Sequence, residues 1–389
     1  MAELQRVLVV SQDFPPEIGG IQSWSHSIAA GLSDLCGTAV LAPSRKGSQH
    51  FDTGQPYEVR RRWTPHTSAF GAAACLSVPA AALRFGARAV LHAQYGSAPG
   101  SYMAKRAGLI DAYFVAAHAR EIVREHLGAP QRRWRRSLLE NASGVFAVSR
   151  YTAGLVAQLG IPAGRIHVVN NGVDLDVFRP KRRSESLERL GLTDLKDRKV
   201  ILTASRLIRR KGIDDSLRAF GSLCDEHPDW VYIVVGDGPM RGVLETIRPE
   251  LVSAGRIRFQ GRVPFGDLVH YYSLADLFAM PSREEPGGDV EGFGLVFLEA
   301  GASGTAVLGA DSGGISDAVV DGENGLLARP GDMRDLVEKM SSLLGDDDLR
   351  ARLAAGGIKL SGRFTWERAA RRIFDTMAAT IGGETGGGR

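Results

Sequence analysis

The sequence predicts an α/β protein with two doubly wound domains, each built on a parallel sheet. Short, nearly continuous apolar segments alternate with helical patterns, as expected of parallel strands that are buried on both faces. The alternation occurs in two sets, which the charged, strand-poor segment 181–199 separates. Two sets joined by such a linker indicate two layered α/β domains.

The expected elements follow from the apolar segments in order. Strands of the first set cover residues 7–10, 38–42, 89–93, 112–117, 144–148 and 166–169, with a helix over 22–33 after the first strand. Strands of the second set cover residues 200–204, 231–235, 257–260, 277–280 and 306–308. We place the domain boundary at 180/181 and expect the glycine-rich segment 382–389 to be a disordered tail.

Composition excludes several classes of protein. Glycine makes up 47 of 389 residues, well above the roughly 7% of average usage, and has no collagen-like period. Cys36, Cys75 and Cys224 are odd in number and far apart, which argues against a disulfide framework or zinc site and for a reducing compartment. No signal peptide is expected. The uncharged segment 63–83 contains two prolines, so we expect no membrane-spanning helix there, although a peripheral membrane contact stays open.

Charge is unevenly distributed along the chain. Residues 1–180 carry 19 Lys and Arg against 12 Asp and Glu, whereas residues 181–389 carry 29 against 32. The N-terminal half is therefore the better candidate to meet an anionic surface or acceptor.

Ligands of doubly wound sheets bind beyond the carboxyl ends of the strands, so the loops after the strands are the candidate sites. In the first loop, DFPPEIGGIQS, Gly19 and Gly20 come directly before a helix. Paired glycines there let backbone N–H groups approach a phosphate at the helix N-terminus, while a simple turn is an equal alternative. The loop matches neither GxGxxG nor a P-loop.

The loop SRLIRRKG follows the first strand of the second set. Arg206 and Lys211 lie five residues apart just beyond a buried strand, which suits them to hold a diphosphate. For Arg209 and Arg210 we expect a solvated position instead.

The segment DVEGFGLVFLEA is the most informative. Glu291 and Glu299 are eight residues apart, and Gly292, Phe293 and Gly294 stand at an expected helix start. Glu299 follows four apolar residues, so its carboxylate needs polar partners. The two hydroxyls of a sugar or ribose diol would serve, and an arginine in the core is the alternative.

Three further polar positions have structural alternatives. His118 follows an expected strand, where it could contact a sugar hydroxyl or be a packed polar residue. Asp174 and Asp176 have the DxD spacing of a metal-bridged nucleotide site, but no other carboxylates flank them, so we favour a structural turn. The acidic run 346–348 indicates the start of a helix.

Together these loops resemble the family 4 retaining glycosyltransferases of the GT-B fold, over nearly the whole chain. Within that family, the opening loop and DVEGFGLVFLEA are most similar to the actinobacterial phosphatidylinositol-mannoside mannosyltransferases. The motifs that carry the resemblance are DFPPEIGGIQS, AHARE, AVSRYT, NNGVD, SRLIRRKG, VVGDGP, EGFGLVFLE and FTWE.

The resemblance implies two Rossmann-like domains that face a central cleft. Residues 1–180 would form the acceptor side and 181–363 the nucleotide-sugar side, with a last helix at about 364–381 that crosses back to the first domain. Transfer would need no metal and no cofactor besides the nucleotide sugar.

The resemblance also implies roles for single residues. Gly19 and Gly20 would lie against the donor phosphate and sugar, and His118 would contact the transferred sugar and help catalysis. Arg206 and Lys211 would neutralise the diphosphate leaving group. Glu291 would bind sugar hydroxyls as a second catalytic residue, Glu299 would hold the ribose, and Phe293, Gly294 and Leu295 would lie near phosphate. The family usually has glycine after the histidine, where this chain has Ala119.

Two basic–aromatic clusters are candidates for an acceptor or membrane surface. Arg60, Arg61 and Arg62 precede a tryptophan, and Arg132, Arg133 and Trp134 lie in QRRWRR. On a helix or loop they would suit an anionic lipid, with a solvated basic face as the alternative.

The leading hypothesis is therefore transfer of mannose from GDP-mannose to a lipid or lipid-linked acceptor by a cytoplasmic, peripheral enzyme. The first alternative is transfer from a UDP-sugar to a soluble small molecule. The second is a binding protein without transferase activity, and no nucleic-acid-binding motif supports a nucleic acid as its partner. The sequence does not indicate an oligomeric state.

Overall fold

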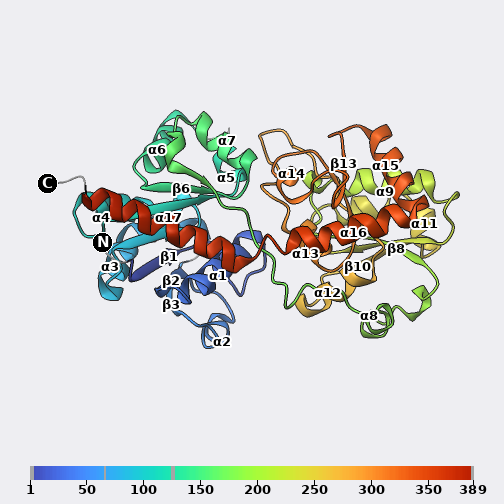
Figure 1. The fold of residues 1–389 in the computed structure, drawn as a ribbon, viewed down its shortest axis with the longest axis horizontal. Helices are drawn as coiled ribbons and strands as arrows, with labels where there is room; N and C mark the ends of the chain where they lie inside the picture. Colours follow the sequence, from blue (N-terminus) through green and yellow to red (C-terminus); the bar gives the residue numbers. More distant parts are fainter. Residues whose placement is uncertain (1–3, 65–66, 124–127, 387–389) are drawn as a thin grey trace. The chain divides into compact units, whose positions relative to one another are not determined.

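The computed structural model describes residues 4–64, 67–123 and 128–386, and the chain divides into two units (Figure 1). Unit 1 comprises Met1–Asn171 and Trp366–Arg389, and unit 2 comprises Gly172–Thr365. The sequence places these boundaries at 180/181 and 363/364. At the first boundary, Val173 lies in unit 2, where it forms an isolated β-bridge with Thr365 and donates its N–H to the Phe364 carbonyl at 2.8 Å.

Unit 1 is a parallel sheet of seven strands within the described residues, in the order β3-β2-β1-β4-β5-β6-β7. The strands are β1 Arg6–Val10, β2 Gly37–Pro43, β3 Glu58–Arg62, β4 Ala89–His92, β5 Ala112–Ala117, β6 Gly144–Ala147 and β7 Ile166–Val168. The helices are α1 Gly20–Ser33, α2 Ser48–Asp52, α3 Thr67–Phe85, α4 Pro99–Arg106, α5 Arg120–Val123, α6 Ala129–Glu140, α7 Arg150–Gln158 and α17 Trp366–Gly386, with short 3₁₀ turns η1 Tyr95–Ser97 and η2 Ala163–Arg165.

Unit 2 is a parallel sheet of six strands within the described residues, in the order β10-β9-β8-β11-β12-β13. The strands are β8 Lys199–Ala204, β9 Trp230–Val235, β10 Ile257–Gly261, β11 Leu277–Ala279, β12 Ala306–Ala310 and β13 Gly325–Ala328. The helices are α8 Arg183–Leu190, α9 Ile213–Leu223, α10 Arg241–Glu245, α11 Pro249–Ser253, α12 Phe265–Leu274, α13 Leu295–Ala302, α14 Ile315–Ala318, α15 Met333–Gly345 and α16 Asp347–Ser361, with 3₁₀ turns η3 Thr193–Leu195 and η4 Arg209–Lys211.

The predicted doubly wound fold is confirmed in both units. The central strands are apolar and fully buried, for example Val7–Val10 of β1 and all six residues of β9, because helices cover both faces of each sheet. Strand order reverses beside β1 in unit 1 and beside β8 in unit 2. In such sheets the reversal opens a crevice at the carboxyl ends of the strands, which places the loops after β1, β4, β8 and β11 at the candidate sites.

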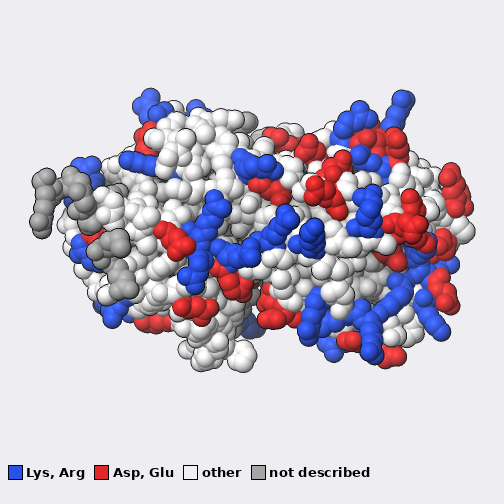
Figure 2. Space-filling model, viewed as in Figure 1, with Lys and Arg blue, Asp and Glu red and all other residues white. Residues whose placement is uncertain are grey.

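Helix α17 returns to unit 1 after unit 2, as the resemblance implies. It packs against α1 so closely that a Cβ on Gly31 would lie 2.5 Å from the Cβ of Ala370. Figure 2 shows basic side chains along α17, on which Arg368, Arg371 and Arg372 are exposed. The helix continues to Gly386, so the predicted disordered tail is wrong for residues 382–386, and residues 387–389 lie outside the described part of the chain.

Two strands were not expected from the sequence. Strand β3 lies at the sheet edge, and its residues, among them Glu58 and three arginines, are exposed or partly exposed, so it lacks an apolar signature. Strand β13 is short, begins with glycine and occupies the other sheet's edge. Among the helices that the structure describes, none is long and apolar enough to cross a bilayer.

Candidate active site

The segments after β8 and β11 come together in unit 2 because these two strands are hydrogen-bonded neighbours. The chain leaves β8 through Arg206 and the 3₁₀ turn η4, and it leaves β11 through Pro281 toward Glu291. Gly212 makes the close approach possible. It has a φ of +64°, and a Cβ there would lie 1.9 Å from the carbonyl oxygen of Pro281.

A buried ion-pair cluster joins the two segments. Lys211 Nζ donates to Glu291 Oε2 at 2.6 Å, and Arg210 Nη1 donates to the same oxygen at 2.7 Å. The Lys211 and Glu291 side chains are only 10% and 14% exposed, so solvent screens this cluster weakly. The structure thus brings together two residues that the sequence selected separately.

Burial and the two cations act on Glu291 in opposite directions. Burial alone would raise the pKa of the Glu291 carboxyl, but Lys211 and Arg210 outweigh it and hold this pKa at about 2. Burial lowers the pKa of Lys211, and Glu291 opposes that effect. Glu291 is therefore a carboxylate at neutral pH, with its negative charge compensated in the free protein.

Arg210 has a role that was not predicted from the sequence, as does Tyr272, described below. We expected Arg210 to be solvated, yet its side chain is 20% exposed and also lies 3.4 Å from Asp289. Both acidic partners lie about eighty positions away in the chain, so nothing near Arg210 signals its burial. Arg209 is 70% exposed and pairs with Glu285, which fits its expected surface position.

Arg206 contrasts with this cluster. Its side chain is exposed and makes no hydrogen bond or ion pair with the described residues, while the next residue, Leu207, is fully buried and anchors the loop. Arg206 therefore remains available to an anion at the carboxyl end of β8.

Helix α13 begins beside Glu291. Gly294 is its N-cap residue, with a φ of +91° and no side-chain cap. The N–H of Phe297 donates to the Gly294 carbonyl at 3.0 Å, whereas those of Leu295 and Val296 have no acceptor among the described residues. Phe293 is buried and packs on Phe364, with ring centroids 6.2 Å apart. Together with Leu295, these residues present the kind of helix start that binds phosphate.

Glu299 lies further along α13 in a largely apolar environment. Tyr272 donates its hydroxyl to Glu299 Oε2 at 2.9 Å, so the partner within the protein is a phenol and not the alternative arginine. Burial raises the pKa of Glu299 to about 7. Its second carboxylate oxygen makes no hydrogen bond with the described residues, which leaves an acceptor for a ligand hydroxyl.

His118 in unit 1 lies at the end of β5. Its Nε2 lies 3.0 Å from the carbonyl oxygen of Ala93, and its ring meets Trp24 edge-on with centroids 5.2 Å apart. Burial lowers the pKa of His118. Because Nε2 must carry the proton to donate to a carbonyl, the neutral ring keeps Nδ1 as an acceptor.

Arg61 of the edge strand β3 holds the loop after β1 in place. The Arg61 guanidinium donates to the Pro15 carbonyl at 2.7 Å and stacks 5.2 Å from the ring centroid of Phe14. Gly19 is the N-cap residue of α1, so the helix starts at Gly20 and its first-turn N–H groups have no side-chain cap within the described part of the chain.

The first arginine cluster differs from the expectation of a helix or loop, because Arg60–Arg62 lie in the edge strand β3. Arg60 pairs with Glu58 and Arg61 with Asp52, whereas Arg62 is exposed. A groove of about 320 Å³ lies between β3 and α3; its lining includes these three arginines, Arg84 and the 84% exposed Leu76.

The second cluster lies on helix α6. Arg132 and Arg133 are exposed, and Trp134 is 46% exposed and packs edge-on against Tyr102.

The acidic residues at 174 and 346, in the DxD motif and the acidic run of the sequence, have structural roles. Asp174 accepts hydrogen bonds from the backbone N–H groups of Asp176 and Val177, and Asp346 caps α16.

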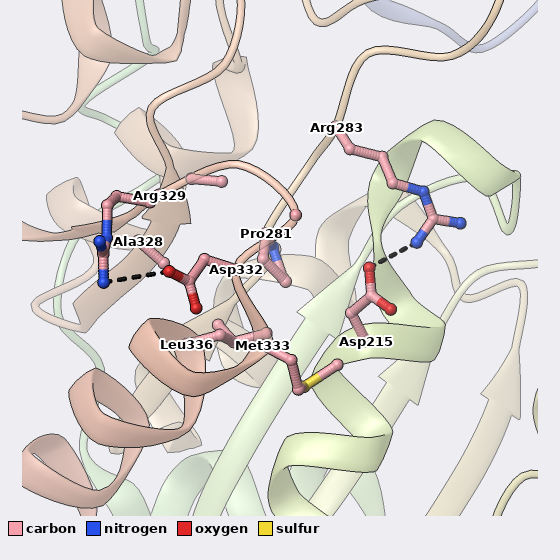
Figure 3. Close-up of a pocket in the computed structure, with 10 residues that line it drawn as sticks. Asp215, Pro281, Arg283, Ala328, Arg329, Asp332, Met333 and Leu336 are labelled. Carbon is pink, nitrogen blue, oxygen red and sulfur yellow. Dashed lines mark hydrogen bonds and ion pairs between the residues drawn. The ribbon is translucent and has the colours of Figure 1, made fainter.

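A separate hollow lies at the carboxyl ends of β11, β12 and β13 (Figure 3). Ion pairs of Arg283 with Asp215 and of Arg329 with Asp332 line it. Its volume of about 50 Å³ suits one or two water molecules and not a nucleotide.

Comparison with known proteins places the chain in a family. Residues 18–177 match the model "Glycosyltransferase Family 4", and residues 189–360 match "Glycosyl transferases group 1". The chain is 32% identical to the GDP-mannose-dependent alpha-(1-6)-phosphatidylinositol monomannoside mannosyltransferase of Mycolicibacterium smegmatis, over 96% of this chain and 98% of that protein. It is 30% identical to the corresponding enzyme for the monoacylated lipid in Corynebacterium glutamicum, over 97% and 99% of the two chains.

A solved structure shows the same fold. Anabaena HepE, in complex with UDP, superposes with a TM-score of 0.82 over 96% of this chain and all of the HepE chain, at 21% identity. The motifs, the two Rossmann-like sheets and these matches agree. The chain belongs to the family 4 glycosyltransferases of the GT-B fold and is similar to the actinobacterial phosphatidylinositol-mannoside mannosyltransferases.

Proposed function

We propose that this protein transfers mannose from GDP-mannose to a hydroxyl of a phosphatidylinositol-based glycolipid, with retention of configuration and without a metal ion. The single observation that carries this proposal is Glu291, ionised and held by Lys211 and Arg210 beside the uncapped start of α13. The relatives that match over their whole length support the choice of donor and acceptor.

The charges of unit 2 suit a diphosphate leaving group. Negative charge develops on the diphosphate as the bond to the sugar breaks, and fixed cations stabilise that charge in the transition state. Arg206 and Lys211 would meet it from the β8 side, and the N–H groups at Gly294 and Leu295 from the α13 side. These groups supply the positive charge that a metal would otherwise bring.

Glu291 and Glu299 would bind the uncharged hydroxyl groups of the donor. Glu291 is ionised at neutral pH and accepts hydrogen bonds from sugar hydroxyls. Glu299, with one oxygen on Tyr272, accepts from the ribose diol with the other. In unit 1, the Nδ1 acceptor of His118 would contact a hydroxyl of the transferred sugar.

Retention through two displacements would require a carboxylate nucleophile. Glu291 is a poor nucleophile, because two cations already bind its carboxylate and its pKa of about 2 makes it a weak base. This favours reaction on one face of the sugar, with the departing diphosphate accepting the proton of the acceptor hydroxyl.

A lipid acceptor requires contact with a membrane surface. We propose a peripheral position on the cytoplasmic face, with the exposed residues Arg62, Leu76, Arg133 and Trp134 of unit 1 as contact points. Vesicles with and without anionic lipid test this: binding of the anionic vesicles at low salt supports it, and absence of binding favours a soluble acceptor.

A donor panel tests the function itself. GDP-mannose, UDP-glucose, UDP-N-acetylglucosamine and UDP-glucuronate are each offered with phosphatidylinositol mannoside in the presence of EDTA, and the product anomer is assigned by NMR. Transfer from GDP-mannose alone, with the α anomer retained, is the expected result. Preference for a UDP-sugar, an inverted product or loss of activity in EDTA contradicts the corresponding part of the proposal.

A further inference from the structure

The turn that carries His118 has a strained backbone. Ala119, the next residue, has a φ of +78° and is fully buried, and it is the one non-glycine residue with positive φ in the described part of the chain. Side chains with a Cβ rarely adopt this left-handed conformation, because the Cβ crowds the following carbonyl. Strain of this kind persists only where the surroundings hold it in place.

A buried carboxylate holds the first end of the turn. Glu121 Oε1 accepts a hydrogen bond from the backbone N–H of His118 at 2.6 Å, and the Glu121 residue is 6% exposed. Burying a carboxylate is costly unless it makes good hydrogen bonds, so this contact restrains the turn strongly.

A buried guanidinium holds the other end. Arg135 of α6 is 4% exposed and donates through Nη1 to the carbonyl oxygen of Ile122 at 2.6 Å. The N–H of Ile122 in turn donates to the carbonyl of Ala119 at 2.8 Å. The five residues from His118 to Ile122 are thus fixed at both ends, by one acid and one base.

The ring of His118 depends on this backbone. With the turn in its left-handed conformation, Nε2 lies 3.0 Å from the Ala93 carbonyl oxygen and the ring meets Trp24 edge-on. If Ala119 relaxed to negative φ, the peptide on either side would rotate and carry the ring away from both partners.

We propose that Glu121 is a positioning residue, which holds the left-handed turn at Ala119 and so fixes His118 in the orientation and tautomer that transfer requires. The inference rests on the proposed function, because it gives His118 a contact with the transferred sugar. A glycine at position 119 would adopt the same backbone without strain. With alanine at position 119, the left-handed turn needs a further restraint, and the hydrogen bond from the His118 N–H to the Glu121 carboxylate provides it.

Turnover kinetics of five variants test this proposal. Glu121→Ala removes the carboxylate, whereas Glu121→Gln keeps an acceptor for the His118 N–H. Ala119→Gly is combined with Glu121→Ala as a rescue, and His118→Ala reports the loss of the ring itself. Glu140→Ala is the matched control, because within the described residues the Glu140 side chain makes an exposed ion pair with Arg136. Donor KM, kcat and melting temperature are measured for each.

We expect Glu121→Ala to lower kcat by about 10- to 100-fold with donor KM unchanged, because a misplaced catalytic group affects the chemical step. Glu121→Gln should keep most of the turnover, and Ala119→Gly should restore a large part of what Glu121→Ala loses. A merely structural role would lower the melting temperature without this kcat-specific, glycine-rescued pattern.

Several outcomes overturn the proposal. One is a folded Glu121→Ala with the kcat of the parent protein while His118→Ala is impaired. Another is Glu121→Gln as impaired as Glu121→Ala. If Glu121→Ala fails to fold, the double variant with Ala119→Gly decides, and a folded double variant no faster than His118→Ala refutes the inference. Normal turnover of His118→Ala is a different failure, because it removes His118 from the proposed function itself.

Discussion

The two units build their candidate site residues by opposite means. In unit 2 the residues are charged, and Lys211, Arg210 and Glu291 compensate one another in a buried cluster. In unit 1 His118 is neutral, and backbone geometry at Ala119 fixes it. The contrast fits the proposed chemistry, in which a diphosphate needs charge and a sugar hydroxyl needs a well-placed acceptor.

The compensation in unit 2 has a consequence for donor binding. If the diphosphate takes Lys211, Glu291 loses one of its two cations but keeps Arg210. Arg210 then holds the carboxylate ionised and in place for the sugar. Unit 2 would thus exchange ion pairs when it binds its donor, whereas the His118 ring of unit 1 is neutral and hydrogen-bonds to the Ala93 carbonyl, so it has no ion pair to exchange.

The largest expected effect concerns Lys211. Lys211→Ala removes both a proposed phosphate ligand and one partner of Glu291, and should lower kcat/KM by about 100- to 1000-fold, the range for loss of one preorganised transition-state donor. Initial rates of transfer from GDP-mannose measure the effect. A cooperative melting transition shows that the variant is folded, although removal of one partner from a buried ion pair should lower the melting temperature. Near-normal turnover of the folded variant would remove Lys211 from the site.

The two glutamates should respond to pH with opposite signs. The pKa of Glu299 is about 7 when folded, above the ordinary value of 4.5, so ionisation of this buried group costs stability as pH rises from about 4.5 to 7. Glu299→Gln should therefore stabilise the free protein by up to about 3 kcal/mol at pH 8 and by little at pH 4.5.

The Glu291 carboxylate, with a pKa of about 2, stabilises the fold above pH 4.5, and this contribution is lost as pH falls toward 2. Glu291→Gln should therefore destabilise the protein at neutral pH. Urea unfolding of both variants between pH 5 and 8 makes the comparison. Changes of the same sign in the two variants would contradict the assignment of opposite electrostatic environments.

A neighbouring pair of arginines tests the ion-pair exchange. Arg210→Ala leaves Glu291 with Lys211 alone and should lower kcat/KM by about 10-fold, the size of a lost charge-assisted hydrogen bond. Arg209→Ala is the matched control, because Arg209 is 70% exposed and its ion pair among the described residues is with Glu285 at 3.3 Å. Equal effects of the two substitutions would show that Arg210 acts through general charge and not through Glu291.

Much of the fold could be predicted from sequence because buried parallel strands are continuous apolar segments. The segment 112–117 is identical to β5, and most other expected strands differ from the structure by one or two residues at their ends. Strand β3 was not predicted, because it is an edge strand with mostly polar side chains. The glycine-rich composition predicted disorder from residue 382, but α17 continues to Gly386. Packing of the earlier part of α17 against α1 stabilises the helix from which these last residues extend.

Site residues could be predicted from the sequence where a charged residue follows a buried strand, because both its charge and its position near the carboxyl end of the sheet are then known. That logic selected Lys211 and Glu291, which the fold then joins. It could not find Arg210 or Tyr272, whose roles depend on acidic partners that lie far away in the chain. Nor could it find the backbone strain at Ala119, since a φ angle is a property of the tertiary structure.

The smallest expected effect isolates the geometry of unit 1 from its chemistry. Ala119→Gly relieves a left-handed alanine, worth about 1–2 kcal/mol, but gives the unfolded chain an entropy advantage of about 0.5–1 kcal/mol. We therefore expect a net stabilisation of up to about 1.5 kcal/mol by urea unfolding. Turnover should be unchanged, because Glu121 still holds the turn. Ala117→Gly, two residues earlier in β5 at ordinary strand geometry, should instead destabilise the protein. Destabilisation by Ala119→Gly would mean that the turn is not strained, and His118 would then owe its position to its ring contacts alone.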